Sequence, residues 1–393
     1  MRTMLELAIW WHGYPLGATG DPIRTEHGEP TPRLRRLDAW LDYAVELGCN
    51  GLLLGPIFQS ASHGYDTLDH YRLDARLGGD EDFDHFISEA HARGLHVTLD
   101  GVFNHVSRHH HIVAERPELI RWDGDQPRAW EGHGDLVELD HDNPEVLDFV
   151  VDIMAHWLRR GIAGWRLDVA YAVPTWVWRA AAERVRAEFP NALFLGEVIH
   201  GDYPRFIEES ALDSVTQYEL WKGIWSSFAA VTGWDLAHAI ERHLSLVERF
   251  IPNTFLGNHD VTRFATKVPQ AVAVAPYLLM TLPGAPSIYY GDEQGFTGTK
   301  TEAWHGDDEI RPALPDSPAE LSTLGAEVLR HHQAAVALRR RHPWLVRAAV
   351  EVLDKANERL TYRAHDGGRE LRVELNLESP SVVITGEGEH ITA

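Results

Sequence analysis

Four short stretches of the sequence place ionisable residues at the point where an apolar run ends. They are Asp100–His105, Gly164–Asp168, Leu195–Val198 and Leu256–Asp260. A parallel β-strand presents a catalytic group at its C-terminal end in this way. Because the stretches are far apart in the chain, they indicate one site that folding assembles from several strands.

Three carboxylates in these stretches suggest the chemistry. Asp168, Glu197 and Asp260 each lie at or just beyond the end of an apolar run. Cleavage of a glycosidic bond needs one carboxylate as a nucleophile and another kept protonated for the leaving oxygen, and a third can stabilise an oxocarbenium-like transition state. Arg166 precedes Asp168 by two residues, so both side chains leave a strand on the same side and Arg166 can keep Asp168 ionised. Taken alone, this spacing also fits a structural salt bridge.

Short apolar strands alternate with amphipathic helices through most of the chain, which is the pattern of a parallel sheet with crossover helices. Eight such units predict a closed (β/α)8 TIM barrel over residues 1–342. A His-, Asp-, Gly- and Trp-rich segment at about 106–142 interrupts the pattern after the third strand, and alternation typical of a small β domain fills 343–393. The expected barrel strands are Glu6–Trp10, Gly51–Gly55, His96–Asp100, Gly164–Asp168, Leu193–Glu197, Ser214–Gln217, Thr254–Asn258 and Ser287–Tyr290.

Composition narrows the class of partner. The formal net charge is -23, from 36 basic and 59 acidic residues, and such a chain repels nucleic acid and anionic membranes. A small neutral ligand is therefore favoured. The lone Cys49 rules out an internal disulfide and a cysteine metal cage, and is expected to be a buried packing residue. Neither a secretory leader nor an apolar run of membrane-spanning length is evident, so we expect a cytoplasmic protein.

The same four stretches resemble the hallmark regions of the α-amylase superfamily of retaining glycoside hydrolases. Two further stretches, Gly64–Tyr71 and Gly284–Glu293, match the family as well, so the resemblance runs from about Trp10 to Arg311. Six motifs in the family's order are far more specific than any one of them alone.

The resemblance implies a role for each matched residue. Asp168 would be the nucleophile, Glu197 the general acid/base and Asp260 the transition-state stabiliser. Arg166 would orient Asp168, while Tyr65, Asp100, His105 and His259 would bind the sugar at the cleavage point. The reaction would be a double displacement that retains the anomeric configuration. Water or an acceptor sugar could resolve the glycosyl-enzyme, so hydrolysis and transfer both stay open.

Details of the motifs favour one branch of the superfamily. After the nucleophile the chain reads Val169-Ala170-Tyr171-Ala172, in place of the Lys-His pair of many long-chain α-amylases, and Gly164–Ala170 is closest to the neopullulanase and cyclomaltodextrinase branch. That branch usually carries an extra N-terminal domain, which is missing here. We therefore expect an α-glucoside hydrolase for short or cyclic α-1,4 or α-1,6 glucans. The alternatives are a glucanotransferase or glucoside isomerase using the same intermediate, and a non-catalytic carbohydrate-binding or transporter-associated scaffold. The oligomeric state is left open.

No metal or cofactor is required by this reading. Asn104 occupies a position where many relatives bind structural calcium, but other members share the residue without the ion, so calcium is compatible with the sequence and not implied by it. The three consecutive histidines His109–His111 cannot all face one ion and are expected in a solvated loop, as a structural rather than a metal-binding feature. Of the tryptophans, Trp122 and Trp130 in the interrupting segment are the candidates for stacking on a sugar.

Overall fold

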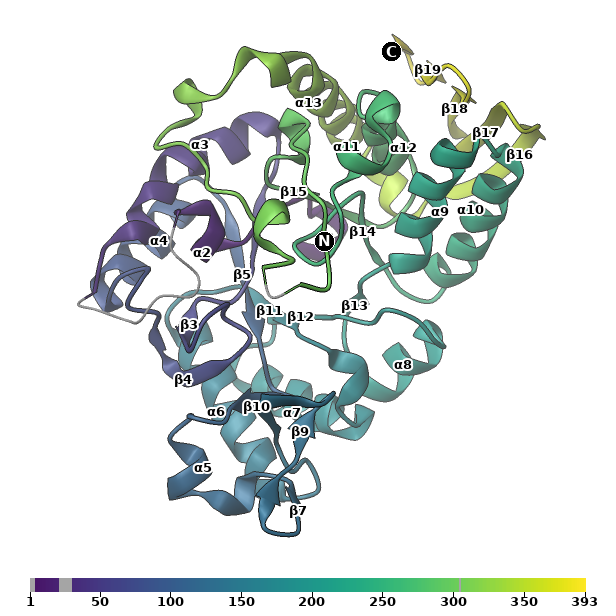
Figure 1. The fold of residues 1–393 in the computed structure, drawn as a ribbon. Coiled ribbons are helices and arrows are strands. Elements are labelled where there is room, and N and C mark those ends of the chain that lie inside the picture. The colour runs from purple at the N-terminus through teal and green to yellow at the C-terminus, as the bar shows by residue number, and fades with distance from the viewer. Residues whose placement is uncertain (1–3, 21–29, 304) are drawn as a thin grey trace.

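The eight expected parallel strands form one sheet that closes on itself (Figure 1). The computed structural model describes residues 4–20, 30–303 and 305–393. An isolated parallel bridge between Thr216 and Asn253 joins the two end strands of the sheet. In spatial order the strands are β13 (Ser214–Val215), β12 (Leu193–Gly196), β11 (Gly164–Leu167), β5 (His96–Gly101), β2 (Gly51–Leu54), β1 (Trp10–Gly13), β15 (Ala285–Tyr289) and β14 (Asn253–Phe255). The predicted (β/α)8 fold class is confirmed.

The prediction for the first strand was wrong. The segment Met4–Leu7, which the expected strand Glu6–Trp10 overlaps, is the short helix α1, and β1 begins only at Trp10. Met, Leu and Glu are good helix formers, and Leu5 of this turn packs into the lower end of the barrel. Residues 1–3 lie outside the described part of the chain.

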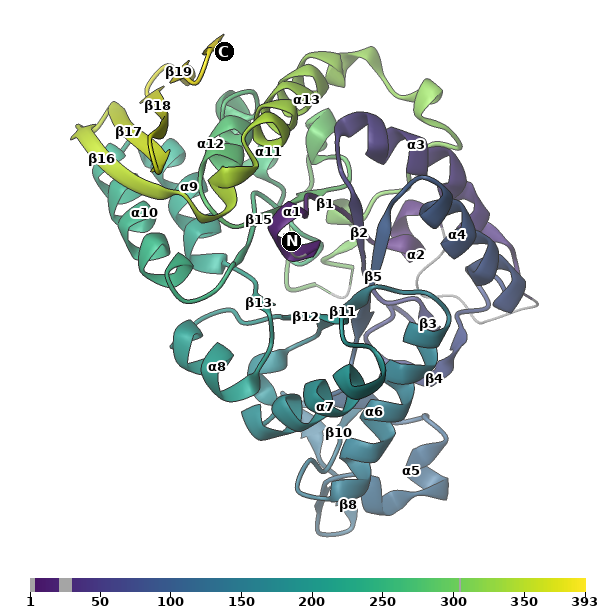
Figure 2. The same cartoon turned by 180° about the vertical axis from the view of Figure 1, so that it is seen from behind.

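Helices connect the strands and surround the sheet, as Figures 1 and 2 show from opposite sides. Gly48 ends α3 with the left-handed conformation (φ 94°) that a glycine adopts without strain. Asn143 caps α6 by accepting a hydrogen bond from the Glu145 N–H. The helices of the barrel are α2 (Pro15–Ala18), α3 (Asp38–Leu47), α4 (Asp80–Ala92), α6 (Pro144–Arg159), α7 (Thr175–Glu188), α8 (Tyr203–Ser210), α9 (Tyr218–Ala230), α10 (Gly233–Val247), α11 (Phe264–Lys267), α12 (Ala275–Thr281) and α13 (Ala326–Arg341).

The segment between β5 and α6 projects from the barrel at the bottom of Figure 1. A hairpin, β3 (Phe58–Ser60) with β4 (Thr67–Leu73), lies after β2. The projecting segment itself is built on a three-stranded antiparallel sheet in the order β6-β10-β9 and a small hairpin of β7 and β8. Its elements are β6 (His105–Ser107), α5 (Ile112–Glu115), β7 (Trp122–Asp123), β8 (Gln126–Pro127), β9 (Ala129–Trp130) and β10 (His133–Glu138).

The C-terminal part is a five-stranded antiparallel sheet in sequence order, and it packs beside α10 (Figure 1). Alternate residues of its central strands are buried against the barrel helices, among them Leu360, Tyr362, Val373 and Ile384. The strands are β16 (Ala349–Lys355), β17 (Arg359–Asp366), β18 (Arg369–Asn376), β19 (Ser381–Gly386) and β20 (Glu389–Thr392). The sheet thus begins a few residues after α13, while the division of the chain at 342/343 stays a prediction.

Inside the barrel, an apolar layer lies below a polar one. Trp10, Leu193 and Ala285 are the first residues of their strands and belong to one buried cluster that also contains Leu5. Because side chains alternate along a strand, His12 projects on the same side of β1 as Trp10, but nearer the C-terminal end. The apolar layer therefore closes the lower end of the barrel, and polar side chains are concentrated at the upper end.

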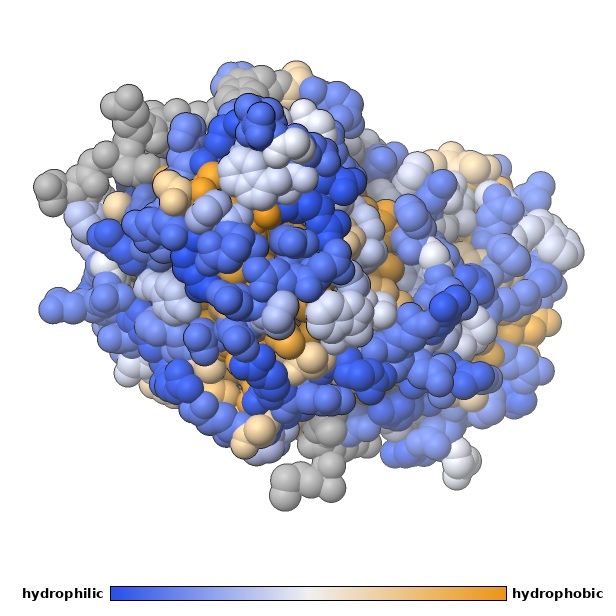
Figure 3. All heavy atoms as spheres, turned by 90° about the horizontal axis from the view of Figure 1, so that it is seen from below, coloured by the Kyte–Doolittle hydropathy of each residue, from blue (hydrophilic) through white to orange (hydrophobic). Residues whose placement is uncertain are grey.

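Two further features bear on the partners. No helix among the described residues is long and apolar enough to cross a membrane. Hydrophilic residues cover most of the face shown in Figure 3, with apolar groups scattered between them.

Cys49 is 5% exposed, which confirms the expected buried position.

Candidate active site

Arg166 on β11 is the centre of the site. Its Nη1 donates to both carboxylate oxygens of Asp100, at 2.8 and 2.9 Å, and to Oδ1 of Asp168 at 2.9 Å. Its Nη2 lies 2.8 Å from Oε1 of Glu197 and 3.9 Å from Oδ2 of Asp260. One buried guanidinium therefore faces four carboxylates that come from four separate segments.

Strand register explains this convergence. In the parallel sheet Arg166 lies opposite Asp100 of β5 and Leu195 of β12, so neighbouring strands end at the same height. Asp168 and Glu197 follow directly after the last residues of β11 and β12. The four stretches singled out from the sequence meet at this end of the barrel.

Glu197 is held by hydrogen bonds to both of its carboxylate oxygens. Tyr218 Oη donates to Oε1 at 3.1 Å, and the backbone N–H of Val169 donates to Oε2 at 3.0 Å. Val169 has a φ of 37°, a left-handed conformation that is strained for a β-branched residue. This conformation turns the Val169 N–H, next to Asp168, toward the carboxylate of Glu197.

Asp260 has a second cationic neighbour. Arg311 Nη2 lies 3.1 Å from Oδ1 of Asp260, and Arg311 Nε donates to the carbonyl of His259 at 2.9 Å. On the other side, His259 Nε2 lies 2.9 Å from Oδ2 of Asp260 and also contacts Tyr65 Oη. Tyr65 Oη in turn donates to Asp100 at 3.0 Å, so Asp260 and Asp100 belong to one hydrogen-bonded cluster.

Burial and neighbouring charge set the ionisation of the cluster. Burial raises the pKa of Asp168 well above its usual value; Arg166 opposes this rise, and the negative charges of Glu197 and Asp100 add to it. Burial also raises the pKa of Asp100. Although burial alone would raise the pKa of Asp260 too, His259, Arg311 and Arg166 together hold it well below its usual range. The pKa values of Asp168 and Asp100 are thus shifted upward, while that of Asp260 is shifted downward.

His105 and Trp130 form one wall beside this cluster. His105 Nε2 lies 3.1 Å from the carbonyl of Tyr65, and the His105 ring is stacked on that of Trp130 at 5.9 Å between centroids. Burial lowers the pKa of His105 to about 4, so its ring is neutral near pH 7. Trp122 lies on the projecting hairpin instead, 40% exposed, with its indole N–H donated to the Pro117 carbonyl.

All eight residues singled out from the sequence are therefore brought together, while their roles stay predictions. Sequence reasoning missed four neighbours: Arg311, Tyr218, His12 and Tyr14. Arg311 ends the stretch that resembles the family, and Tyr218 begins the helix after β13, so their positions held a signal. His12 and Tyr14 lie beyond the expected first strand Glu6–Trp10 and outside every matched motif, yet both contact the ring of His259.

Asn104 and Asp140, which lie beside each other in this part of the barrel, are both engaged with other side chains. Asn104 directs its amide nitrogen toward His105 Nδ1 at 3.2 Å, and Asp140 faces Arg121 at 3.3 Å. Calcium prefers six to eight oxygen ligands. Within the described ranges, no group of three or more His, Cys, Asp or Glu side chains could hold a metal ion.

The expectation of a solvated loop at His109–His111 was partly wrong. His110 is 2% exposed and its Nε2 lies 3.3 Å from Nδ1 of His70, whereas His111 is exposed. The central histidine of the run is thus a packing residue between the projecting segment and β4.

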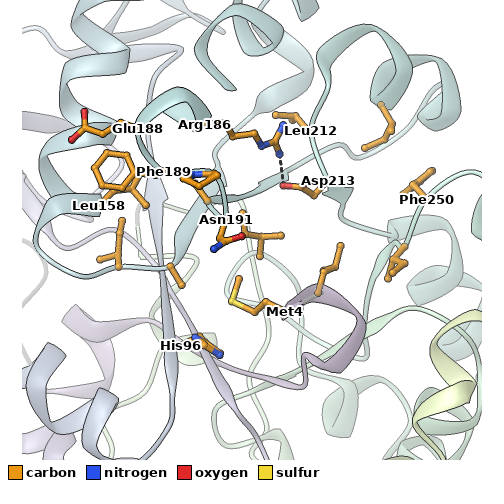
Figure 4. Close-up of a pocket in the computed structure, with 18 of the residues that line it drawn as sticks. Met4, His96, Leu158, Arg186, Glu188, Phe189, Asn191, Leu212, Asp213 and Phe250 are labelled. Carbon is orange, nitrogen blue, oxygen red and sulfur yellow. Dashed lines mark hydrogen bonds and ion pairs between the residues drawn. The ribbon is translucent and has the colours of Figure 1, made fainter. Parts of the chain in front are cut away.

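A cavity of about 890 Å³ lies away from these carboxylates (Figure 4). Met4, His96 and Leu193 line it, which places it at the N-terminal ends of the strands, and its Arg186 and Asp213 are paired at 2.7 Å. The chemistry-bearing residues are at the other end of the barrel. A much smaller polar cavity of about 10 Å³ lies beneath the site, lined in part by His12, Arg166 and His259.

Enzymes with a (β/α)8 barrel carry their active site at the C-terminal ends of the strands. The carboxylates around Arg166 lie at that end, so the fold and the site together indicate an enzyme of this class. Comparison with known families agrees: the family model described as "Alpha amylase, catalytic domain" matches residues 34–123 and 121–323. The chain belongs to the α-amylase family, as its motifs predict.

The most similar relatives include members of the predicted branch. The cyclomaltodextrinase of Geobacillus thermopakistaniensis (strain MAS1) is 28% identical over 424 residues, which cover 96% of this chain and 70% of the relative. Neopullulanase 2 of Thermoactinomyces vulgaris is 32% identical over 289 residues, which cover 66% of this chain and 48% of the relative. The chain thus spans about half the length of the second relative.

Among solved structures, the acarbose-soaked debranching enzyme of Nostoc punctiforme is similar along nearly the whole chain. The TM-score is 0.79 at 28% identity, and the superposition covers 96% of this chain and 91% of the other. The likeness therefore includes the C-terminal sheet as well as the barrel.

Proposed function

We propose that this protein is a retaining α-glucoside hydrolase that acts on short or cyclic α-glucans with α-1,4 or α-1,6 linkages. The observation that carries the proposal is the arrangement around Arg166, which contacts Asp168 and Glu197 and thereby aligns a nucleophile with an acid/base. Two carboxylates of different environment, on either side of one bond, are what double displacement requires.

In the first step, Asp168 attacks the anomeric carbon while Glu197 gives its proton to the leaving glycosidic oxygen. General-acid catalysis requires this proton on Glu197 while Asp168 attacks as the anion. Arg166 then stabilises Asp168 as the anion. Asp260, kept ionised by His259 and Arg311, supplies negative charge for the oxocarbenium-like transition state.

In the second step, Glu197 has become the base. It removes a proton from water, which attacks the anomeric carbon and releases Asp168, so the configuration is retained. The Tyr218 hydroxyl and the Val169 N–H are donors to the ionised carboxylate of Glu197 between the two steps. An acceptor sugar in place of water would make the same enzyme a glucanotransferase.

The substrate class rests on the relatives and on the site. A cyclomaltodextrinase and a neopullulanase are among the similar proteins, and the motif Gly164–Ala170 points the same way. We further propose a neutral oligosaccharide partner, no resident metal or cofactor, and a cytoplasmic location.

The test is chromatographic analysis of products after separate incubation with maltotriose, panose, a cyclodextrin, trehalose and soluble starch. The matched control is Glu197→Gln, which keeps the shape of the side chain and removes its proton transfer. Cleavage of a short or cyclic substrate with retained configuration supports the proposal, and Glu197→Gln should lower the rate about 10²- to 10⁴-fold. Products longer than the substrate indicate transfer, and inactivity on all five substrates contradicts the proposal.

A further inference from the structure

We propose that His12 is a positioning residue for this reaction: its Nε2–H donates to Nδ1 of His259 and fixes the form of His259 whose Nε2–H faces Asp260. The inference rests on the proposed function for its effect on rate. No motif drew attention to His12, which lies on the first strand, far in sequence from His259.

The contact between the two histidines is direct and buried. His12 Nε2 lies 3.0 Å from His259 Nδ1, and the rings meet edge to face with centroids 5.0 Å apart. His12 is 6% exposed and His259 is 1% exposed. Tyr289 packs against the other side of the His12 ring at 5.2 Å, so His12 is fixed in place.

The partners of His259 Nε2 determine where its hydrogen lies. Asp260, at 2.9 Å, is an ionised carboxylate and can only accept. Tyr65 donates its own hydrogen to Asp100, which leaves the Tyr65 oxygen to accept from His259. Nε2 of His259 therefore carries a hydrogen.

In the form of His259 that we propose, Nε2 carries the only ring hydrogen, so Nδ1 is an acceptor and needs a donor. His12 Nε2 is the hydrogen-bond partner that faces it, so His12 carries its hydrogen on Nε2. Burial is the largest cause that lowers the pKa of His12 well below its usual value, and Arg166 adds to it, so His12 is neutral. A neutral donor sets the orientation of His259 without adding charge near Asp260.

The surroundings of His12 allow a conservative replacement. The polar cavity of about 10 Å³ beside it, lined also by Asn253 and Ser287, is about the size of one water molecule. A glutamine amide in this place has room to donate to His259 Nδ1, whereas a leucine of similar size has no donor.

The experiment compares His12→Gln with His12→Leu, using wild-type protein and a matched control, His332→Leu. His332 is also a buried histidine with one hydrogen bond, to the Val328 carbonyl of α13, away from the site. We measure kcat and KM on the best substrate of the wild type, the melting temperature, and the ¹⁵N spectrum of the His259 ring, assigned by its loss in His259→Gln.

We expect His12→Leu to lower kcat about 10- to 100-fold with a much smaller change in KM, because a buried acceptor loses its donor. His12→Gln should recover most of that loss. His332→Leu should affect the melting temperature and leave kcat unchanged. The ¹⁵N spectrum of the wild type should show a neutral His259 with hydrogen on Nε2, and His12→Leu should disturb that pattern.

Three outcomes would overturn the proposal: an unchanged kcat in folded His12→Leu, equal losses in the Leu and Gln variants, or a wild-type His259 with its hydrogen on Nδ1. Inactivity of the wild type on every glucan would instead refute the proposed function. The ¹⁵N measurement would still decide the positioning role in that case.

Discussion

Arg311 offers a direct test of what keeps the pKa of Asp260 low. Its guanidinium contacts Asp260 but lies outside the motif that contains Asp260. It lies 3.1 Å from the carboxylate and also donates to the carbonyl of His259. Replacing Arg311 with Met keeps much of the aliphatic stem that packs in this region and removes the charge and all of the hydrogen bonds.

The expected magnitude follows from that geometry. A hydrogen bond to a charged group contributes about 1.5–3 kcal/mol, and about 1.36 kcal/mol corresponds to a tenfold change in rate. The Asp260 side chain is 28% exposed, so solvent screens part of the interaction. We therefore expect kcat/KM to fall by about one order of magnitude in Arg311→Met, toward the lower end of this range.

The variant should also change the pH dependence in a defined direction. Arg311 is among the groups that hold the pKa of Asp260 well below its usual range. Without it that pKa rises, so the acid limb of kcat/KM moves to higher pH. The stability that ionised Asp260 contributes is fully present above its unfolded pKa of about 3.9 and is lost as pH falls through the folded value. The stability gap between wild type and variant should accordingly be full at pH 7 and narrow in acid.

The assay is kcat/KM on maltotriose from pH 8 to below pH 4, with urea unfolding at pH 7 and at the acid end of the range. Arg186→Met is the matched control, because Arg186 is paired with Asp213 at 2.7 Å at the opposite end of the barrel. It should lose some stability and keep both the rate and the acid limb. If folded Arg311→Met retains the wild-type rate and acid limb, the assignment of Arg311 to Asp260 is refuted.

Three other predictions concern the packing of Gly51, the contribution of Trp130 to substrate binding, and stability in acid. In Gly51→Ala the new Cβ would lie 2.3 Å from the Trp10 ring, so urea unfolding should show a loss of about 1–3 kcal/mol, and an unchanged midpoint would count against the packing described. Trp130→Ala removes the ring stacked on His105 and should raise KM several-fold with little effect on melting, whereas an unaltered KM would remove Trp130 from the site. Burial lowers the pKa of His70 to about 4 from 6.5, so the unfolded chain binds the extra proton and stability falls as pH drops from about 6.5 to about 4. This effect is about 3 kcal/mol and should be absent from His70→Gln, and an equal acid loss in both proteins would contradict it.

The barrel was predictable because its strands are short apolar runs that end in polar residues. This pattern can be recognised in each strand alone, without knowing which strands pair with it. Strand β11 shows this well: Gly164–Leu167 is entirely buried, and Asp168 follows at once. The prediction of the first strand was wrong because the run Glu6–Trp10 is about as apolar as the true strands, although it begins inside helix α1. Only pairing of Trp10 with Gly51 and Ser287 in the sheet determines where β1 begins.

For the site, the residues carried by motifs were found and the residues that support them were not. Asp168, Glu197 and Asp260 each stand at a recognisable strand end. His12 acts through the ring of His259, from a strand nearly 250 residues earlier, and no local pattern distinguishes it from a packing histidine. Such partners become visible only when strands from opposite ends of the chain are adjacent in the closed sheet.

The charge balance of the site explains why it needs residues from so much of the chain. Three buried carboxylates and the partly exposed Asp260 around one arginine would repel one another too strongly for all of them to ionise. The second cation, Arg311, comes after the last barrel strand and pairs with Asp260. Arg166 pairs with Asp100, Asp168 and Glu197. The two arginines thereby shift the cluster unevenly: the pKa of Asp260 is held low, while those of Asp168 and Asp100 stay raised by burial. This difference depends on the segment after β15 folding back to the strand ends, because that segment supplies Arg311.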